Sequence, residues 1–105
     1  SDDYIHEDRV RLELYRRLSK ASDIQEVYAI EEEMEDRFGK PDVVTKQFIE
    51  LIIIKILALN LGIQNISSYE MNITFVSADN TKETIKSPSR DDDDIIATTL
   101  RYLRR

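Results

Sequence analysis

Four consecutive aspartates, Asp91 to Asp94, are the residues of this chain best suited to metal chemistry. Clustered carboxylates are the ligands that Mg²⁺ and Ca²⁺ prefer, so a metal-dependent enzyme is one hypothesis they raise. Consecutive residues at the start of a helix point in different directions, however, and a calcium loop needs alternating ligands and a glycine. Negative charge in the first turn of a helix is favoured by the helix dipole. We therefore interpret the run as helix capping rather than as a metal site.

Other catalytic chemistry finds little support in the sequence. His6 is the only histidine and there is no cysteine, so a catalytic triad, a zinc site and thiol catalysis lack their residues. His6 is expected to be an exposed bystander near the chain terminus. Gly39-Lys40 is followed by Pro41, which matches neither a phosphate-binding loop nor a dinucleotide-binding motif. We expect no catalytic residue, metal or cofactor in this chain, which predicts a protein that is not itself an enzyme.

An acidic helical segment ending in Asp36-Arg37-Phe38-Gly39 is the main candidate for function through binding. At 100° per residue, one side of this helix is polar and is predicted to point outward. The residues on that outward side are Gln25, Glu32, Glu33 and Asp36. The simplest interpretation is a solvated face, because most charge runs are no more than that. The alternative is a surface that binds a protein partner.

Glu31 and Glu35 are less ordinary, because they fall within the angular span of the apolar stripe. Either they lie at its edge and reach Arg16 or Arg17 on the preceding helix, or that part of the stripe faces a partner. Two other charged residues raise a similar question.

Arg11 and Lys55 each lie among apolar neighbours on their helices. The stems of both are expected to pack while the charged heads reach water or a carboxylate. A buried Lys55 would require a carboxylate partner.

The elements that carry these residues follow from hydrophobic periodicity. Val10, Leu14 and Leu18 predict a first helix over residues 7–21. Ser22 and Gln25 are predicted to form a capping box for a second helix, which Gly39 ends. The apolar stripe of that second helix is Ile24, Val27, Ile30, Met34 and Phe38.

A third helix is predicted from Pro41-Asp42 to about Leu61, ended by Gly62. It is apolar almost all round from Leu51 onward, so we expect it to be a central helix covered on several sides.

Beyond Gly62 the pattern changes to short strands. Segments 66–69, 71–76 and 81–85 are predicted strands, and the second alternates Met71, Ile73 and Phe75. The aspartate run leads into a last helix that carries Ile95 to Leu103. The predicted fold class is α+β, with a three-helix unit, a small antiparallel sheet and a closing helix.

Composition narrows the class of protein further. At 105 residues the chain is expected to form one domain, and its net charge of -6 argues against direct nucleic-acid binding. The apolar run from Leu51 to Leu59 is interrupted by Lys55 and is shorter than the about 20 residues of a membrane span. The lack of cysteine fits an intracellular protein. Because the chain begins without Met and ends at Arg104-Arg105, we expect it to be a fragment of a larger multidomain protein.

Four blocks of sequence carry a resemblance to a known family. They are Tyr4-Ile5, the segment Arg11-Leu12-Glu13-Leu14-Tyr15-Arg16-Arg17-Leu18, Asp36-Arg37-Phe38-Gly39 with Pro41, and Leu61-Gly62-Ile63. In order and spacing they resemble the C-terminal (TRCF) domain of bacterial transcription-repair coupling factor (Mfd), over roughly residues 4–66. Residues 67–105 depart from the family pattern, which generally has an additional helix before the last sheet segment.

The resemblance implies a specific function. The parent protein would be a cytoplasmic, ATP-driven DNA translocase that removes stalled RNA polymerase and recruits excision repair through UvrA. Its C-terminal domain would be non-catalytic and would pack on the N-terminal UvrB-like module, masking the UvrA-binding surface until the polymerase is engaged. Other domains of the parent would bind ATP, DNA and RNA polymerase.

The residues expected to contact the partner come from the acidic helix and its neighbour. They are Glu31, Glu32, Glu35, Asp36, Arg16 and Arg17. The family motif does not settle which of them touch, whereas Arg37, Phe38 and Gly39 are interpreted as structural. The alternative function is a stand-alone module that homodimerises through the apolar third helix.

Overall fold

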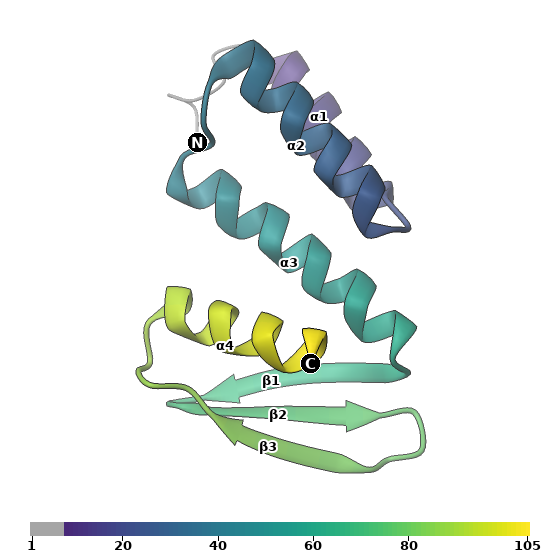
Figure 1. Cartoon of the computed structure of the whole chain (residues 1–105), viewed down its shortest axis with the longest axis vertical. Helices are drawn as coiled ribbons and strands as arrows, with labels where there is room; N and C mark the ends of the chain where they lie inside the picture. Colours follow the sequence, from purple (N-terminus) through teal and green to yellow (C-terminus); the bar gives the residue numbers. More distant parts are fainter. Residues whose placement is uncertain (1–7) are drawn as a thin grey trace. The chain divides into compact units, whose positions relative to one another are not determined.

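The computed structural model describes residues 8–105 and shows four helices and a three-stranded sheet in that part of the chain (Figure 1). In chain order these are α1 (Asp8–Lys20), α2 (Ile24–Phe38), α3 (Val43–Asn60), β1 (Ile63–Tyr69), β2 (Asn72–Ser77), β3 (Lys82–Lys86) and α4 (Asp92–Arg104). The α+β class and the order of helices, sheet and closing helix are confirmed. His6 and the Tyr4-Ile5 block lie outside the described residues.

The chain divides into two compact units, with the boundary between Ile53 and Ile54 inside α3. In the first unit α1 and α2 run antiparallel as a helical hairpin (Figure 1). Their apolar stripes form its core as the periodicity predicts. The buried residues of these two stripes include Leu14, Leu18, Val27, Ile30 and Met34.

Tyr15 joins α1 to the first part of α3. Its ring lies 4.9 Å from that of Phe48, centroid to centroid, and its hydroxyl is 3.3 Å from the Thr45 hydroxyl. Thr45 is fully buried, so this hydrogen bond satisfies a polar group that would otherwise be costly to bury.

The cap of α2 lies one residue later than predicted. Asp23, not Ser22, is the N-cap, and its carboxylate accepts a hydrogen bond from the Glu26 backbone N–H at 2.9 Å. The Glu26 carboxylate in turn accepts from the Ser22 backbone N–H at 3.2 Å. Both Ser22 and Asp23 are good capping residues, and Asp23 has a glutamate three residues on, where Ser22 has only Gln25.

Gly39 ends α2 in a conformation that other residues rarely adopt. Its φ is 84° and its ψ is -172°, while its N–H donates to the Glu35 carbonyl at 2.9 Å. This region of φ/ψ space is essentially restricted to glycine. The predicted role of Gly39 as the helix stop is confirmed.

Replacing Gly39 with alanine is expected to destabilise the chain by about 1–3 kcal/mol. No atom lies within 4 Å of the position where the new Cβ would stand, so the loss would come from the backbone alone. Urea denaturation followed by circular dichroism measures it. An unchanged midpoint would show that the backbone relaxes to negative φ without cost.

The third helix is buried on more than one side, as predicted, but not all round. Ile49, Ile53 and Ile56 are buried on one side and Ile54 and Ala58 on another, whereas Leu51 remains 52% exposed and Lys55 is also exposed. Because α3 is apolar on nearly every side, its pattern could not show which side is covered. Lys55 therefore needs no buried carboxylate partner.

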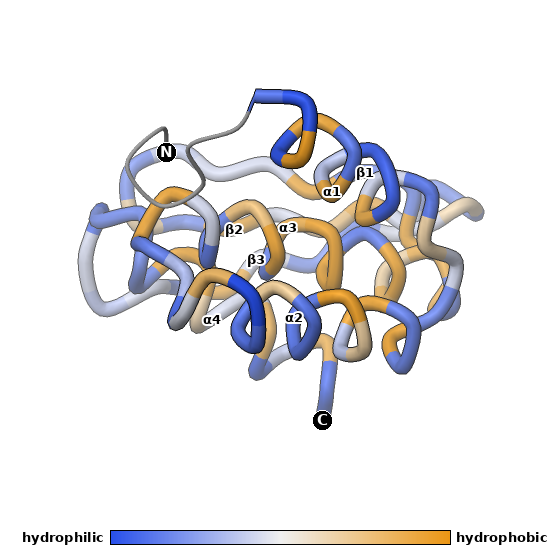
Figure 2. The backbone as a smooth tube through the Cα atoms, turned by 90° about the horizontal axis from the view of Figure 1, so that it is seen from above, coloured by the Kyte–Doolittle hydropathy of each residue, from blue (hydrophilic) through white to orange (hydrophobic). Residues whose placement is uncertain are grey.

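In the second unit the sheet is antiparallel in the order β1–β2–β3. Ile73 and Phe75 of β2 are buried as the alternation predicts, and the Phe75 ring stacks on Tyr102 of α4 with centroids 4.2 Å apart. Along the helical coils of the chain, hydrophobic and hydrophilic stretches alternate, as expected for helices with one packed face (Figure 2). β1 begins three residues earlier than predicted, with a register shift between Ile63 and Asn65.

Candidate functional site

Three carboxylates stand exposed along α2 and form what we term the acidic ridge: Glu32, Glu35 and Asp36. Within residues 8–105 none of the three side chains forms a hydrogen bond or ion pair. Exposed Tyr28, one turn before Glu32, extends the same side of the helix. The ridge therefore offers three negative charges that form no ion pair or hydrogen bond in this part of the chain, although the charge of Glu35 adds to the raised pKa of Lys46.

The other acidic residues of α2 are already engaged in the first unit. Glu31 is only 13% exposed at its side chain and accepts a hydrogen bond from Lys46 Nζ of α3 at 2.9 Å. This bond raises the pKa of Lys46. Glu31 thus binds α3 and not Arg16 or Arg17, since its position on α2 points toward the third helix.

Glu33 is the carboxylate that reaches α1. Arg17 donates two hydrogen bonds to it, both 2.9 Å long, and Arg37 lies 3.6 Å from the same carboxylate. The hydrogen bonds from Arg17 hold the pKa of the Glu33 carboxyl below its ordinary value. Glu33 was expected on the outward side, but it lies half-buried between α1 and α2, where it links the two helices.

Arg16 and Arg11 are paired within α1. Arg16 donates to Glu13 at 2.7 and 3.0 Å, and Arg11 donates to Asp8 at 3.0 Å. The Arg11 stem is largely covered while its head is paired, as expected. Of the six predicted contact residues, three have charged partners in the structure, and the three residues of the acidic ridge do not.

The Arg17–Glu33 pair predicts a pH dependence of stability. Because the folded-state pKa of Glu33 is depressed, its contribution is present above the unfolded glutamate pKa of about 4.3 and is lost as pH falls through the folded value. The contribution is expected to be below about 1 kcal/mol, because both side chains are more than one-third exposed. Comparing the pH profiles of urea midpoints for the chain and for Glu33→Gln measures it. A difference that does not shrink between about pH 5 and pH 3 would contradict this assignment.

The aspartate run lies where the helix dipole favours it, with Asp92, Asp93 and Asp94 in the first turn of α4. The N-cap residue Asp91 makes no side-chain capping bond, so the expected capping is only electrostatic. Instead Ser89 donates its hydroxyl to Asp94 at 2.6 Å and accepts from the Asp91 N–H at 3.0 Å. In the described part of the chain no group of three or more His, Cys, Asp or Glu residues is placed to hold a metal ion.

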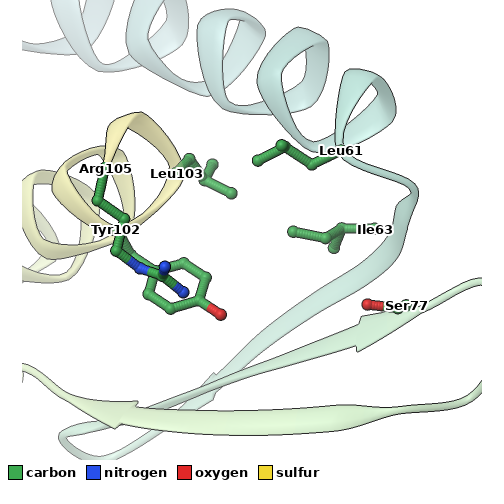
Figure 3. A pocket seen from close by; sticks show the side chains of 6 residues that line it. All are labelled: Leu61, Ile63, Ser77, Tyr102, Leu103 and Arg105. Carbon is green, nitrogen blue, oxygen red and sulfur yellow. The ribbon is translucent and has the colours of Figure 1, made fainter.

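A pocket of about 230 Å³ opens in the second unit beside the end of α4 (Figure 3). Leu61, Ile63 and Leu103 give it an apolar wall, and Ser77, Tyr102 and Arg105 complete the lining. The Arg105 guanidinium lies 4.0 Å from the Tyr102 ring centre. The Tyr102 hydroxyl donates a hydrogen bond to the Glu83 carboxylate, and this bond raises the pKa of Tyr102. These polar groups pair with one another and form no recognisable catalytic arrangement.

Sequence reasoning missed two features of the first unit. It did not single out Lys46, whose partner is fifteen residues away on another helix. It also did not find a cleft lined by Arg9, Arg17 and Arg37, since these residues come together only when α1 and α2 fold into a hairpin. Among residues 8–105, no helix combines the length and the apolarity needed to cross a membrane.

These observations define a small α+β domain whose charged helices are suited to binding. A family model described as the TRCF domain matches residues 1–87. The chain is 50% identical over 99 residues to a transcription-repair-coupling factor of Helicobacter pylori strain J99, covering 94% of this chain and 10% of that protein. It is 30% identical over 92 residues to one of Rickettsia prowazekii, covering 85% of this chain and 8% of that protein. The chain belongs to the TRCF domain family.

A solved structure shares the fold. The crystal structure of the C-terminal domain of a transcription-repair coupling factor matches with a TM-score of 0.82 and 16% identity, over 99% of this chain and 83% of that one. The likeness in fold therefore extends through residues 67–105. The family model also continues to residue 87, so the predicted departure from the family pattern was wrong for residues 67–87. The chain spans about a tenth of the length of the curated relatives it matches.

Proposed function

We propose that this chain is a non-catalytic regulatory domain of a transcription-repair coupling factor. It packs on the N-terminal UvrB-like module of the same protein and masks the UvrA-binding surface until stalled RNA polymerase is engaged. Membership of the TRCF family supports the proposal that the parent protein is a transcription-repair coupling factor. The acidic ridge is the observation that supports a binding role, because its three exposed carboxylates form no ion pair or hydrogen bond within the described residues.

The charge distribution suits a contact that must later release. Exposed carboxylates facing a basic surface set register and specificity more than affinity. The pairs Arg17–Glu33 and Lys46–Glu31 hold α2 in place on its neighbours, so binding would not require the ridge to reorganise. A clamp of moderate strength can be displaced when a competing ligand favours the open state.

Other activities of the parent are assigned to its other domains. The net charge of -6 does not favour contact with a phosphate backbone, so DNA and RNA polymerase would be bound elsewhere. ATP would likewise be used by the motor domains, and the whole protein would act in the cytoplasm.

Calorimetric titration of this chain into the isolated UvrB-like module of its own parent tests the proposal, with UvrA as the competitor. Saturable binding that UvrA displaces is the expected result. Tethering within one chain provides an effective concentration of about 1 mM, so weak binding would still be sufficient. No saturable binding up to that concentration, or binding that UvrA leaves unchanged, would contradict masking.

One observation favours a second function, homodimerisation through α3. In the first unit this helix leaves Val43, Val44 and Leu51 more than half exposed. Sedimentation equilibrium tests it: a mass that doubles with concentration and returns to the monomer value in Leu51→Lys would support dimers.

A further inference from the structure

A cleft of about 220 Å³ lies in the first unit, apart from the acidic ridge. Its apolar part is provided by Val10 and Leu14 of α1, and Leu14 is buried. Its charged lining comprises Arg9, Glu13, Arg17 and Arg37. Apolar surface bordered by guanidinium groups is unusual on a chain whose net charge is -6.

The charges around this cleft do not balance. Arg17 and Arg37 share a single carboxylate, that of Glu33, and Glu13 is occupied by two hydrogen bonds from Arg16. Arg9 is exposed and forms no ion pair within residues 8–105. Of the three guanidinium groups in the lining, two share the Glu33 carboxylate and Arg9 forms no ion pair within residues 8–105. Because Glu13 is balanced by Arg16, two positive charges remain in excess.

We propose that this arginine cleft binds an acidic side chain of a protein partner, together with an apolar residue next to it. The carboxylate would be held by Arg9 and Arg37, because the planar guanidinium presents paired donors that match a carboxylate. The neighbouring apolar residue would cover Val10, which is only partly buried.

The surroundings favour a carboxylate over a nucleic-acid phosphate. Phosphate backbones need an extended row of cations, whereas here the excess is confined to two charges and the ridge on the same helix is negative. An apolar floor also gives a phosphate nothing to bind.

This inference does not depend on the proposed masking function. Arg37 lies about 100° around α2 from Asp36 of the ridge, so the two surfaces are separate. Together they would present opposite charges to a partner, which fixes orientation more strictly than either sign alone.

The test uses the 105-residue chain and two synthetic peptides as probes. Acetyl-Asp-Leu-Asp-Leu-Asp-amide carries the acidic and apolar groups, and acetyl-Asn-Leu-Asn-Leu-Asn-amide is its neutral match. Titration followed by two-dimensional ¹⁵N NMR is expected to shift the signals of Arg9 to Arg17 and of Arg37 with the acidic peptide only. The shifts should weaken as salt rises, because the attraction is screened.

Arg9→Gln removes one charge without disturbing packing, since Arg9 is exposed. It is expected to weaken binding of the acidic peptide about tenfold, the loss of a charged hydrogen bond. Lys20→Gln removes the same charge from the exposed end of α1 and should leave affinity unchanged.

Equal responses to the two peptides, or equal losses in Arg9→Gln and Lys20→Gln, would overturn the proposal. So would the absence of localised shifts up to about 10 mM peptide, where binding worth only about 3 kcal/mol would still be seen. If a single-stranded oligonucleotide binds the cleft more tightly than the acidic peptide does, the cleft would instead be assigned to nucleic acid.

Discussion

Replacing Leu18 with alanine is expected to lower the free energy of unfolding by about 2–5 kcal/mol. Leu18 is 0% exposed in the core between α1 and α2, so truncation removes buried methyl groups and leaves a cavity. For a chain of this size a loss of 1 kcal/mol lowers the melting temperature by about 4–8 °C. Thermal and urea denaturation followed by circular dichroism measure the change.

Leu12→Ala is the matched control for Leu18→Ala. It makes the same replacement in the same helix, but Leu12 is 64% exposed. Its effect should stay within about 0.5 kcal/mol. Equal losses in the two variants would show that helix propensity, and not burial, determines the response of α1.

Replacing Phe75 with alanine is the second large effect, expected at about 3–5 kcal/mol. Phe75 is 2% exposed and its ring stacks on Tyr102, so the variant loses both buried area and an aromatic contact between β2 and α4. Urea denaturation and amide hydrogen exchange in β2 measure the loss.

Tyr69→Ala provides the comparison for Phe75→Ala. Tyr69 lies in neighbouring β1 and is 76% exposed, so its replacement should cost no more than about 1 kcal/mol of strand propensity. If the β2 amides exchange faster in Tyr69→Ala but not in Phe75→Ala, this result would contradict the packing of α4 on β2.

Elements were predictable where a periodic pattern coincided with a strong stop. Gly39 and Gly62 both have positive φ and both follow helices that end where expected. The cap of α2 was misplaced by one residue because Ser22 and Asp23 are both able to cap, and only the folded backbone selects between them. The start of β1 was missed because Gln64 and Asn65 give no apolar alternation.

The candidate site was only partly predictable. Angular position on α2 correctly placed Glu32 and Asp36 outward, but it could not reveal that Glu33 would face α1 and pair with Arg17. Partners on other helices depend on how the helices pack, and one helix alone does not contain that information. The exposed side of α3 was hidden for the opposite reason, since an all-apolar helix carries no angular signal.

Calorimetric titration of ridge variants into the UvrB-like module of the parent tests the central claim most directly. Glu32→Gln with Asp36→Asn removes two charges from the acidic ridge, and Asp91→Asn with Asp92→Asn removes two from the exposed start of α4. The ridge pair is expected to weaken binding about tenfold or more, and the α4 pair by less than about twofold. If the ridge double variant and the α4 double variant bind the module with equal affinity, the acidic ridge is not the surface through which this TRCF domain binds.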